Sequence, residues 1–285
     1  MSEKGLIVLK SIIENNLIYL IDRVVLNTDK AIINDFSEEL KNICIKNEIK
    51  YLYFSDLDSI DSQYSIAISW RWLIKETNSK LIVLHDSLLP KYRGFAPLVN
   101  SLINQEKCIG VTALFASKEY DKGEIIYQGK SEVNYPITIQ EAINVVSLIY
   151  SELVLKILNN LAKNLPLESY KQNENLASYS LWRDDNDYYI NWERSAEYIS
   201  RFVDAVGFPY VGAKSKINEK TIIIEKVAVV NDLVIENRDV GKIIFLDNTK
   251  PLVVCGEGLI KIESAIYEET GESIFPLKKF RIKFK

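Results

Sequence analysis

Short apolar runs alternate with helical patterns over roughly the first 180 residues of the chain. Lys50–Phe54, Ser65–Ser69 and Leu81–Leu84 are almost continuously apolar, which is typical of short strands buried on both faces. Between such runs, Phe36–Glu48 and Gly94–Asn104 repeat apolar residues at helical spacing. This alternation predicts an α/β fold, namely a Rossmann-like, doubly wound domain with a mainly parallel sheet.

The same half holds further expected elements. Ile18–Val25 and Gly110–Ala116 are strand-like, and a long helical pattern that includes Ala142 and Leu161 ends near Pro166, because proline cannot continue a helix. A doubly wound domain normally begins with a strand. Here the apolar run Gly5–Leu9 leads directly into a helix, so we expect the first strand to be very short, missing or upstream.

The chain changes character after the long helix. The polar segment Glu168–Asp187 is interpreted as a connection, and a helix is expected at about Glu193–Val206. Only short strand-like runs separated by turn residues follow, as in a small β-rich domain of barrel or hairpin type; they are Thr221–Val230, Val240–Leu246, Leu252–Cys255 and Leu259–Ser264. We therefore predict two domains, 1–180 and 181–285. The alternating tail Lys279–Lys285 is expected to form an edge strand.

Composition excludes some classes of function. The net charge is -4 and the pI about 5.4, which argues against a nucleic acid as the main partner. Three scattered cysteines and a single histidine do not make a zinc site, so no metal is expected. The sequence has no signal peptide and no apolar run near the ~18 residues of a membrane span. We expect a cytoplasmic protein without a membrane partner.

His85 and Asp121 are the candidate catalytic residues. His85 directly follows the apolar run Leu81–Leu84, and ligands of open α/β sheets bind at the carboxyl ends of strands. A single histidine is equally compatible with a structural role. Asp121 precedes Gly123, a pattern that favours turns, so a catalytic role for Asp121 requires that it meets His85 in space.

Together these segments resemble the 10-formyltetrahydrofolate-dependent formyltransferases. The shared pattern is His-x-Ser-Leu-Leu-Pro-x-Tyr-Arg-Gly from His85, then Gly-Val-Thr from Gly110, then Asp-x-Gly-x-Ile from Asp121. The stretch Asp187–Trp192 resembles the family's carboxy-terminal domain. The resemblance implies that an amine attacks the formyl carbon of 10-formyltetrahydrofolate, with His85 as general acid and base and Asp121 orienting the imidazole.

The resemblance also implies binding residues. The expected folate contacts are Trp72, Leu73, Ile74, Ser87, Leu88, Leu89, Pro90, Ser117 and Tyr120. The tryptophans of Trp70–Trp72 are also compatible with aromatic core packing. Lys91, Tyr92 and Arg93 are the expected substrate contacts, and the two cations are placed to hold a pyrophosphate. An alternative for both cations is a solvated surface charge.

One position departs from the family. Relatives have an asparagine two residues before the histidine, where this chain has Val83. Valine cannot donate a hydrogen bond, and losing one donor from comparable oxyanion sites costs about 3 kcal/mol. Three explanations stay open: a different donor such as a backbone N–H, His85 acting as an imidazolium, or chemistry that is altered or lost.

The branch of the family sets the acceptor. We expect a nucleotide-sugar N-formyltransferase, a homodimer that formylates a UDP- or dTDP-linked 4-amino-4,6-dideoxysugar for surface glycans such as O-antigen, with a pseudaminic-acid precursor as one candidate. A methionyl-tRNA formyltransferase is the main alternative, although its polyanionic substrate favours a basic surface. A formyltetrahydrofolate hydrolase and a folate-binding protein without turnover are the others. Glycinamide ribonucleotide formyltransferases lack the second domain.

Overall fold

The computed structural model describes residues 2–28, 34–72, 74, 79–277 and 279–285, which form two compact units. The first unit holds the chain up to Leu98, Lys107–Val133 and Glu141–Leu181. The second holds Val99–Glu106, Asn134–Gln140 and Trp182–Lys285. The chain leaves the first unit for the last time at Leu181, and the two domains 1–180 and 181–285 stay a prediction. Within the described residues, none of the helices is long and apolar enough to cross a membrane.

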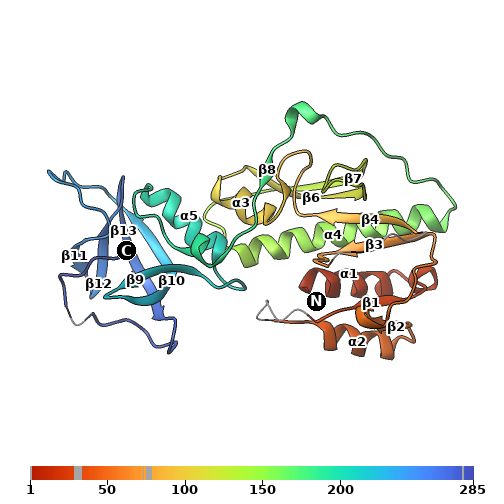
Figure 1. The fold of residues 1–285 in the computed structure, drawn as a ribbon, viewed down its shortest axis with the longest axis horizontal. Coiled ribbons are helices and arrows are strands. Elements are labelled where there is room, and N and C mark those ends of the chain that lie inside the picture. Colours follow the sequence, from red (N-terminus) through yellow and green to blue (C-terminus); the bar gives the residue numbers. More distant parts are fainter. Residues whose placement is uncertain (1, 29–33, 73, 75–78, 278) are drawn as a thin grey trace. The chain divides into compact units, whose positions relative to one another are not determined.

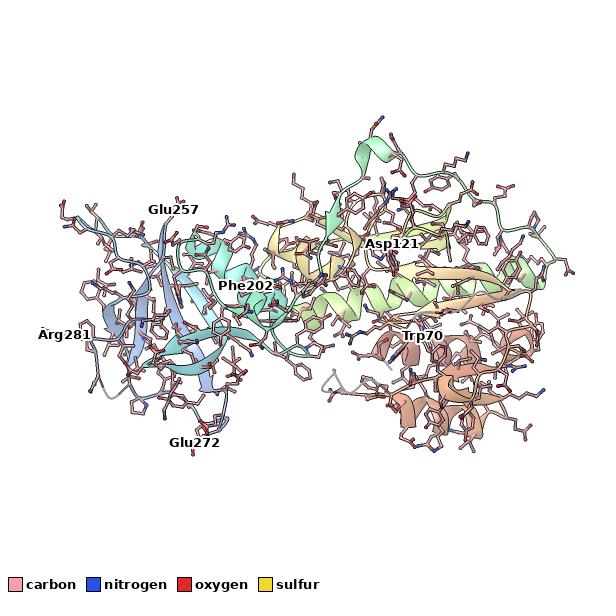
Figure 2. The ribbon with its side chains drawn as sticks, viewed as in Figure 1. Trp70, Asp121, Phe202, Glu257, Glu272 and Arg281 are labelled. Atoms are coloured by element: carbon pink, nitrogen blue, oxygen red, sulfur yellow. The ribbon has the colours of Figure 1, made fainter. Side chains whose placement is uncertain are left out.

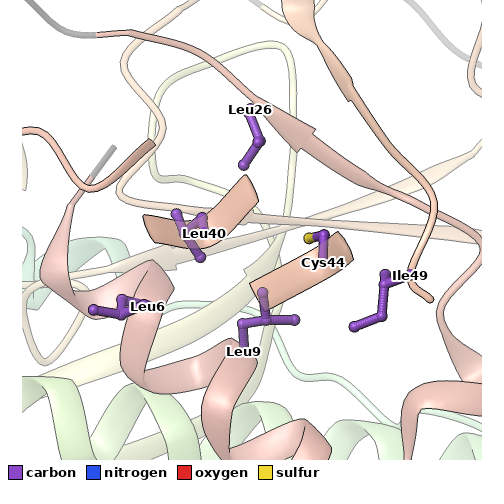
Figure 3. Packing of buried hydrophobic residues seen from close by; sticks show 6 residues of the cluster. All are labelled: Leu6, Leu9, Leu26, Leu40, Cys44 and Ile49. Carbon is purple, nitrogen blue, oxygen red and sulfur yellow. The ribbon is translucent and has the colours of Figure 1, made fainter. Parts of the chain in front are cut away.

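The N-terminal part of the first unit packs two helices beside two short strands (Figure 1). Its elements are α1 (Glu3–Glu14), β1 (Val24–Leu26), α2 (Ser37–Lys46) and β2 (Tyr51–Tyr53), and β1 and β2 pair in parallel. A cluster of buried side chains joins the four elements (Figure 3); it comprises Leu6, Leu9, Leu26, Leu40, Cys44 and Ile49. The expected strand Ile18–Val25 is wrong in part, because Ile18–Leu20 forms a 3₁₀ turn, η1.

A mixed four-stranded sheet forms the centre of the first unit. Its order is β3 (Tyr64–Ile68), β4 (Lys80–His85), β6 (Cys108–Phe115) and β7 (Ile125–Glu132). Only β3 and β4 pair in parallel, since β6 and β7 run antiparallel to their neighbours. The predicted α/β class with a β-rich C-terminal domain is therefore confirmed, but this sheet is not mainly parallel, because β6 runs antiparallel to both β4 and β7 and the sequence pattern did not predict β7.

The next two helices along the chain are α3 (Pro97–Ile103) and α4 (Ile139–Ala162). Helix α3 starts three residues later than expected, because Gly94 has a φ of +100° and forms the short strand β5 (Arg93–Gly94). Helix α4 approaches β7 closely: a side chain at Gly129 would place its Cβ 2.4 Å from Ile149. The hydroxyl of Tyr150 in α4 donates to the carbonyl of Leu84 at 3.0 Å.

An antiparallel sheet dominates the second unit. Its strand order is β11 (Ile243–Asp247), β12 (Lys250–Val254), β13 (Leu259–Tyr267), β10 (Lys220–Val230) and β9 (Ala213–Ile217). Helix α5 (Ala196–Val206) packs on β10, and the hydroxyl of Ser195 caps its N-terminus by accepting from the Tyr198 N–H. Strand β9 was not expected from the sequence.

The C-terminal tail does not form the expected edge strand. Among the described residues of the tail, Lys283 makes an isolated bridge with Lys242, and the backbones of Lys285 and Lys216 exchange hydrogen bonds. The Phe284 side chain is 1% exposed and packs against Trp192, with the ring centroids 5.6 Å apart. Burial of one aromatic ring therefore anchors the tail without a regular ladder.

Candidate active site

His85 is the last residue of β4 and its side chain is nearly buried. It pairs with Thr112 of β6 and is 8% exposed. The Nε2 atom lies 2.8 Å from the carbonyl oxygen of Tyr92, and Nδ1 lies 3.5 Å from Oδ1 of Asp121. Both ring nitrogens thus face acceptors, whereas a neutral imidazole can donate from only one of them.

Asp121 lies in the loop between β6 and β7 (Figure 2). Its Oδ2 atom accepts a hydrogen bond from the Gly94 N–H at 2.8 Å, which leaves Oδ1 directed toward the imidazole. Asp121 has a left-handed backbone, with φ of +56°. Gly123 closes the loop, since a Cβ there would lie 1.7 Å from the Phe115 carbonyl oxygen. The turn-forming and catalytic interpretations of Asp121 are therefore compatible.

The pair has the geometry of an acid–base device. A carboxylate beside one imidazole nitrogen fixes the ring orientation and stabilises the ring when it gains a proton. The other nitrogen, Nε2, is hydrogen-bonded to the Tyr92 carbonyl. Nε2 must therefore release this partner before it can take a proton from a substrate.

The loop after His85 is held firmly from β6 and β7. The Thr112 hydroxyl donates to the carbonyl of Ser87 at 2.7 Å and accepts from the Leu89 N–H at 3.1 Å. The side chain of Gln128 donates to the Leu89 carbonyl at 2.9 Å. Ser87 and Leu89 are nearly buried, and the Leu88 side chain packs over Gly110. Their side chains therefore serve this packing, and Pro90 continues the same loop.

The expected folate contacts are only partly described. Leu73 lies outside the described residues. Trp72 packs edge-on against Trp70, with the ring centroids 5.0 Å apart, and Ile74 is half-buried. On the opposite wall, the Ser117 hydroxyl donates to the Glu119 carbonyl at 2.7 Å, and the Tyr120 side chain is 78% exposed.

Arg93 contradicts both expectations for it. Its side chain is fully buried, and Nη1 and Nη2 donate to the two carboxylate oxygens of Glu174 at 2.8 and 2.7 Å. This fork-shaped pair raises the pKa of Arg93. Arg93 is therefore neither placed to hold a pyrophosphate nor a solvated surface charge. Lys91 is exposed, and Tyr92 contributes its carbonyl to His85.

Val83 lies on the same face of β4 as His85, two residues earlier. It packs against a buried apolar cluster of Leu89, Leu114 and Ile125. The position of the family asparagine is therefore apolar in this chain, and no hydrogen-bond donor comes from its side chain.

A second buried network lies next to His85 and was not expected. The Lys4 ammonium of α1 is paired with the Asp86 carboxylate, and the single Tyr150 hydroxyl proton is shared between that carboxylate at 2.6 Å and the Leu84 carbonyl at 3.0 Å. Burial opposes ionisation of Asp86, but the Lys4 charge and these hydrogen bonds outweigh it, so the pKa of Asp86 lies below its ordinary value. The only signal in the sequence was a lysine on the buried face of an apolar helix.

The segment Glu168–Asp187, interpreted from the sequence as a connection, also contacts the loops of the site. Gln172 donates from Nε2 to the carbonyl oxygens of Asp121 and Gly123 at 2.7 and 2.9 Å. The Ser178 hydroxyl accepts from the Tyr92 N–H at 2.9 Å. Polar residues without periodicity gave no local sign of these contacts.

The described residues also contain a pocket of about 270 Å³ in the second unit, which shares no residue with the His85 site. It is lined by Arg183, Asn186, Asp187, Tyr189, Ile190, Asn191, Arg194, Tyr198, Ile199 and Phe202.

Comparison with known proteins follows the division into two units. A formyl transferase family model matches residues 63–148, and the model of the family's C-terminal domain matches residues 183–274, together more than half of the chain. The fold and the site define an α/β protein with a histidine–aspartate pair and a β-rich C-terminal unit. With both models matched, the chain belongs to the formyl transferase family.

The individual relatives are only distantly similar to this chain in sequence. The methionyl-tRNA formyltransferase of Halothermothrix orenii is 33% identical over 186 residues, which are 64% of this chain and 58% of that protein, so the match spans less than two thirds of it. The N-formyltransferase of Helicobacter canadensis, solved with folinic acid and dTDP-3-aminofucose, superposes with a TM-score of 0.67 at 20% identity and covers 91% of this chain and 95% of that one. The methionyl-tRNA formyltransferase of Clostridium thermocellum superposes with a TM-score of 0.57 at 19% identity and covers 75% and 96%. These likenesses concern the fold.

Proposed function

We propose that the protein is an N-formyltransferase that moves the formyl group of 10-formyltetrahydrofolate to the amino group of a nucleotide-linked amino sugar. The observation that carries the formyl-transfer part is the buried His85 at the carboxyl end of β4, with Asp121 at 3.5 Å from its Nδ1. Membership of the formyl transferase family supports the same chemistry.

The pair acts through proton transfer. As the substrate amine attacks the formyl carbon and the new N–C bond forms, His85 accepts the proton that the amine loses. Asp121 stabilises the resulting imidazolium. His85 then returns the proton to the folate nitrogen as the bond from that nitrogen to the formyl carbon breaks. Imidazole is the side chain best suited to transfer a proton in both directions near neutral pH.

The aromatic cluster beside β3 fits a flat, hydrogen-bonding co-substrate. Trp70 packs edge-on against Phe54 and Trp72, at centroid distances of 5.1 and 5.0 Å. Its indole Nε1–H is buried without a partner among the described residues. A buried donor without a partner is costly, and an acceptor on the pterin of folate would relieve that cost. We therefore place Trp72 and Ile74 at the folate side of the site.

The negative charge in the tetrahedral intermediate needs donors, and Val83 supplies none. The Gly94 N–H is already bound by Asp121. We propose that the protonated ring of His85 supplies this donor in place of the side chain at position 83.

The proposal for the substrate that accepts the formyl group starts from the net charge of the chain. The net charge of -4 disfavours a large polyanion, because Lys and Arg contacts to phosphates supply most nucleic-acid affinity. The likeness to the Helicobacter canadensis protein over nearly all of both chains supports an amino sugar linked to dTDP or UDP. Lys91, exposed directly after the active-site loop, is the cation proposed to meet the pyrophosphate.

Methionyl-tRNA is the second candidate acceptor. It is favoured by the 33% identity to the Halothermothrix orenii methionyl-tRNA formyltransferase. The two candidates share the chemistry of His85 and Asp121, so only the product distinguishes them.

The test is a set of parallel reactions followed by mass. The protein is incubated with 10-formyltetrahydrofolate and, separately, dTDP- and UDP-linked 3-amino and 4-amino dideoxyhexoses or methionyl-tRNA. We expect a sugar nucleotide to gain the mass of one formyl group. This product should disappear with His85→Asn and should still form with Asp58→Asn, a control at an exposed position. Formylated tRNA alone moves the proposal to the second candidate. Formate without any formylated acceptor indicates a hydrolase and overturns both.

A further inference from the structure

Residues 167–181, here called the strap, join the two loops that carry the partners of His85. The strap pairs with β7 through the Tyr170–Ile125 bridge. Its strand β8 (Tyr179–Ser180) pairs in parallel with β5. The Ser178 backbone accepts from the Arg93 N–H at 2.9 Å. The strap therefore fixes the loop that supplies the Tyr92 carbonyl and the Gly94 N–H.

Gln172 is the strap side chain that bonds to both loops. Its Nε2 donates to the carbonyls of Asp121 and Gly123 at 2.7 and 2.9 Å. Its Oε1 accepts from Nη2 and Nε of Arg93 at 2.8 and 3.1 Å. Every hydrogen-bonding atom of the amide is used, and Arg93 is itself buried and anchored on Glu174. Since O and N of an amide have fixed roles here, this arrangement needs Gln rather than Glu.

Asp121 is a residue that needs such an anchor. Its φ of +56° lies in the left-handed region, which aspartate tolerates better than most residues but which persists only where neighbouring structure holds it. Gln172 bonds to the carbonyl of Asp121 itself. A change of backbone conformation there would swing the carboxylate away from the Nδ1 atom of His85, which is already 3.5 Å from Oδ1.

We propose that Gln172 is a positioning residue for the catalytic pair: it locks the backbone of Asp121 so that the carboxylate faces His85 and the Gly94 N–H. This inference rests on the proposed function in one respect: the proposed function is what makes His85 and Asp121 catalytic. The Arg93–Glu174 pair supports Gln172 from behind, which explains why an arginine beside the active-site loop is buried rather than presented to a substrate.

The test uses two variants with different losses. Gln172→Glu keeps acceptors for Arg93 but loses both donations to the Asp121 loop, and Gln172→Met loses all four hydrogen bonds without adding charge. Lys171→Gln is the matched control, because Lys171 is an exposed neighbour of Gln172 in the same strap. His85 is the only histidine in the chain, so its ring resonances in an ¹⁵N NMR spectrum need no assignment and report its surroundings without turnover.

We expect the His85 ring resonances to move in both Gln172 variants and to stay in place in Lys171→Gln. We also expect kcat to fall about tenfold or more in both Gln172 variants, with a larger loss of melting temperature in Gln172→Met than in Gln172→Glu. Wild-type resonances and kcat in either folded Gln172 variant overturn the proposal, as does a change equal in size in Lys171→Gln. If the wild type shows no formyl transfer but the resonances still move, the positioning stands and the proposed function fails.

Discussion

The Asp121–His85 contact can be tested with a change of a single atom. In Asp121→Asn, the amide retains the size of the carboxylate and one oxygen. That oxygen is expected to keep accepting from the Gly94 N–H at 2.8 Å. The NH₂ group then faces Nδ1 of His85, where Oδ1 lay at 3.5 Å. The charge is lost, and a donor now favours the imidazole tautomer with its proton on the wrong nitrogen.

The size of the effect follows from the distance. Two opposite charges 3.5 Å apart interact by about 4.7 kcal/mol at an effective dielectric constant of ~20. Since ~1.36 kcal/mol corresponds to one factor of ten, the full interaction corresponds to about three orders of magnitude. The Asp121 side chain is 15% exposed and shares its charge with Gly94, so we expect kcat to fall by about 10²- to 10³-fold.

The assay is the initial rate of formyl transfer at saturating folate and acceptor, with Asp58→Asn as the exposed control. Melting temperature checks that the variant is folded. A folded Asp121→Asn protein within tenfold of wild-type kcat would refute the reasoning, because the carboxylate would then not stabilise the charge that develops on His85.

Three further changes test other parts of the structure. Val83→Asn restores a donor beside His85; we expect kcat to rise about tenfold or more at a stability cost of about 1–3 kcal/mol, and an unchanged kcat would show that the oxyanion is bound elsewhere. Lys4→Met strands the buried Asp86 and should lower the free energy of unfolding by about 3–5 kcal/mol in denaturant titrations, with recovery in the double variant with Asp86→Leu. The folded-state pKa of Asp86 is depressed, so its contribution to stability is present above the unfolded pKa of ~3.9 and is lost as the pH falls through the folded pKa. The unfolding free energies of wild type and Lys4→Met should therefore converge in acid. A difference between them that stays constant with pH contradicts this. Gly123→Ala puts a Cβ 1.7 Å from the Phe115 carbonyl and should cost about 2 kcal/mol or more of stability and reduce kcat, whereas wild-type values for both would mean that the loop adapts freely.

Local patterns were sufficient for much of the fold. Apolar runs of strand length predicted β3, β4 and β6 to within a few residues, and helical spacing predicted α2, α4 and α5. The errors lie where the apolar pattern is weak or where an apolar run forms a turn. Strand β7 has only two buried residues at its start and alternates afterwards, and Ile18–Leu20 is apolar but turns within three residues.

The candidate site divides in the same way. The motif itself indicated His85 and Asp121, because spacing and residue type are local properties of the sequence. The chain alone did not say whether the two meet. The answer depends on β6 pairing with β4 and on the loop after it, because β6 ends beside Ile82 and only the course of that loop brings Asp121 back to His85.

Only the tertiary structure decided which partners the charged side chains have. By itself the sequence determined an α/β unit with a histidine at a strand end, a β-rich unit after it, and a valine where relatives have asparagine. It left Arg93 open between a ligand contact and a surface charge, and gave no role to Gln172. Those two residues are 79 positions apart in the chain, and no local pattern relates them. Their contact exists because the strap returns over the active-site loop, and burial of a guanidinium is tolerated only where the fold brings a carboxylate and an amide to meet it.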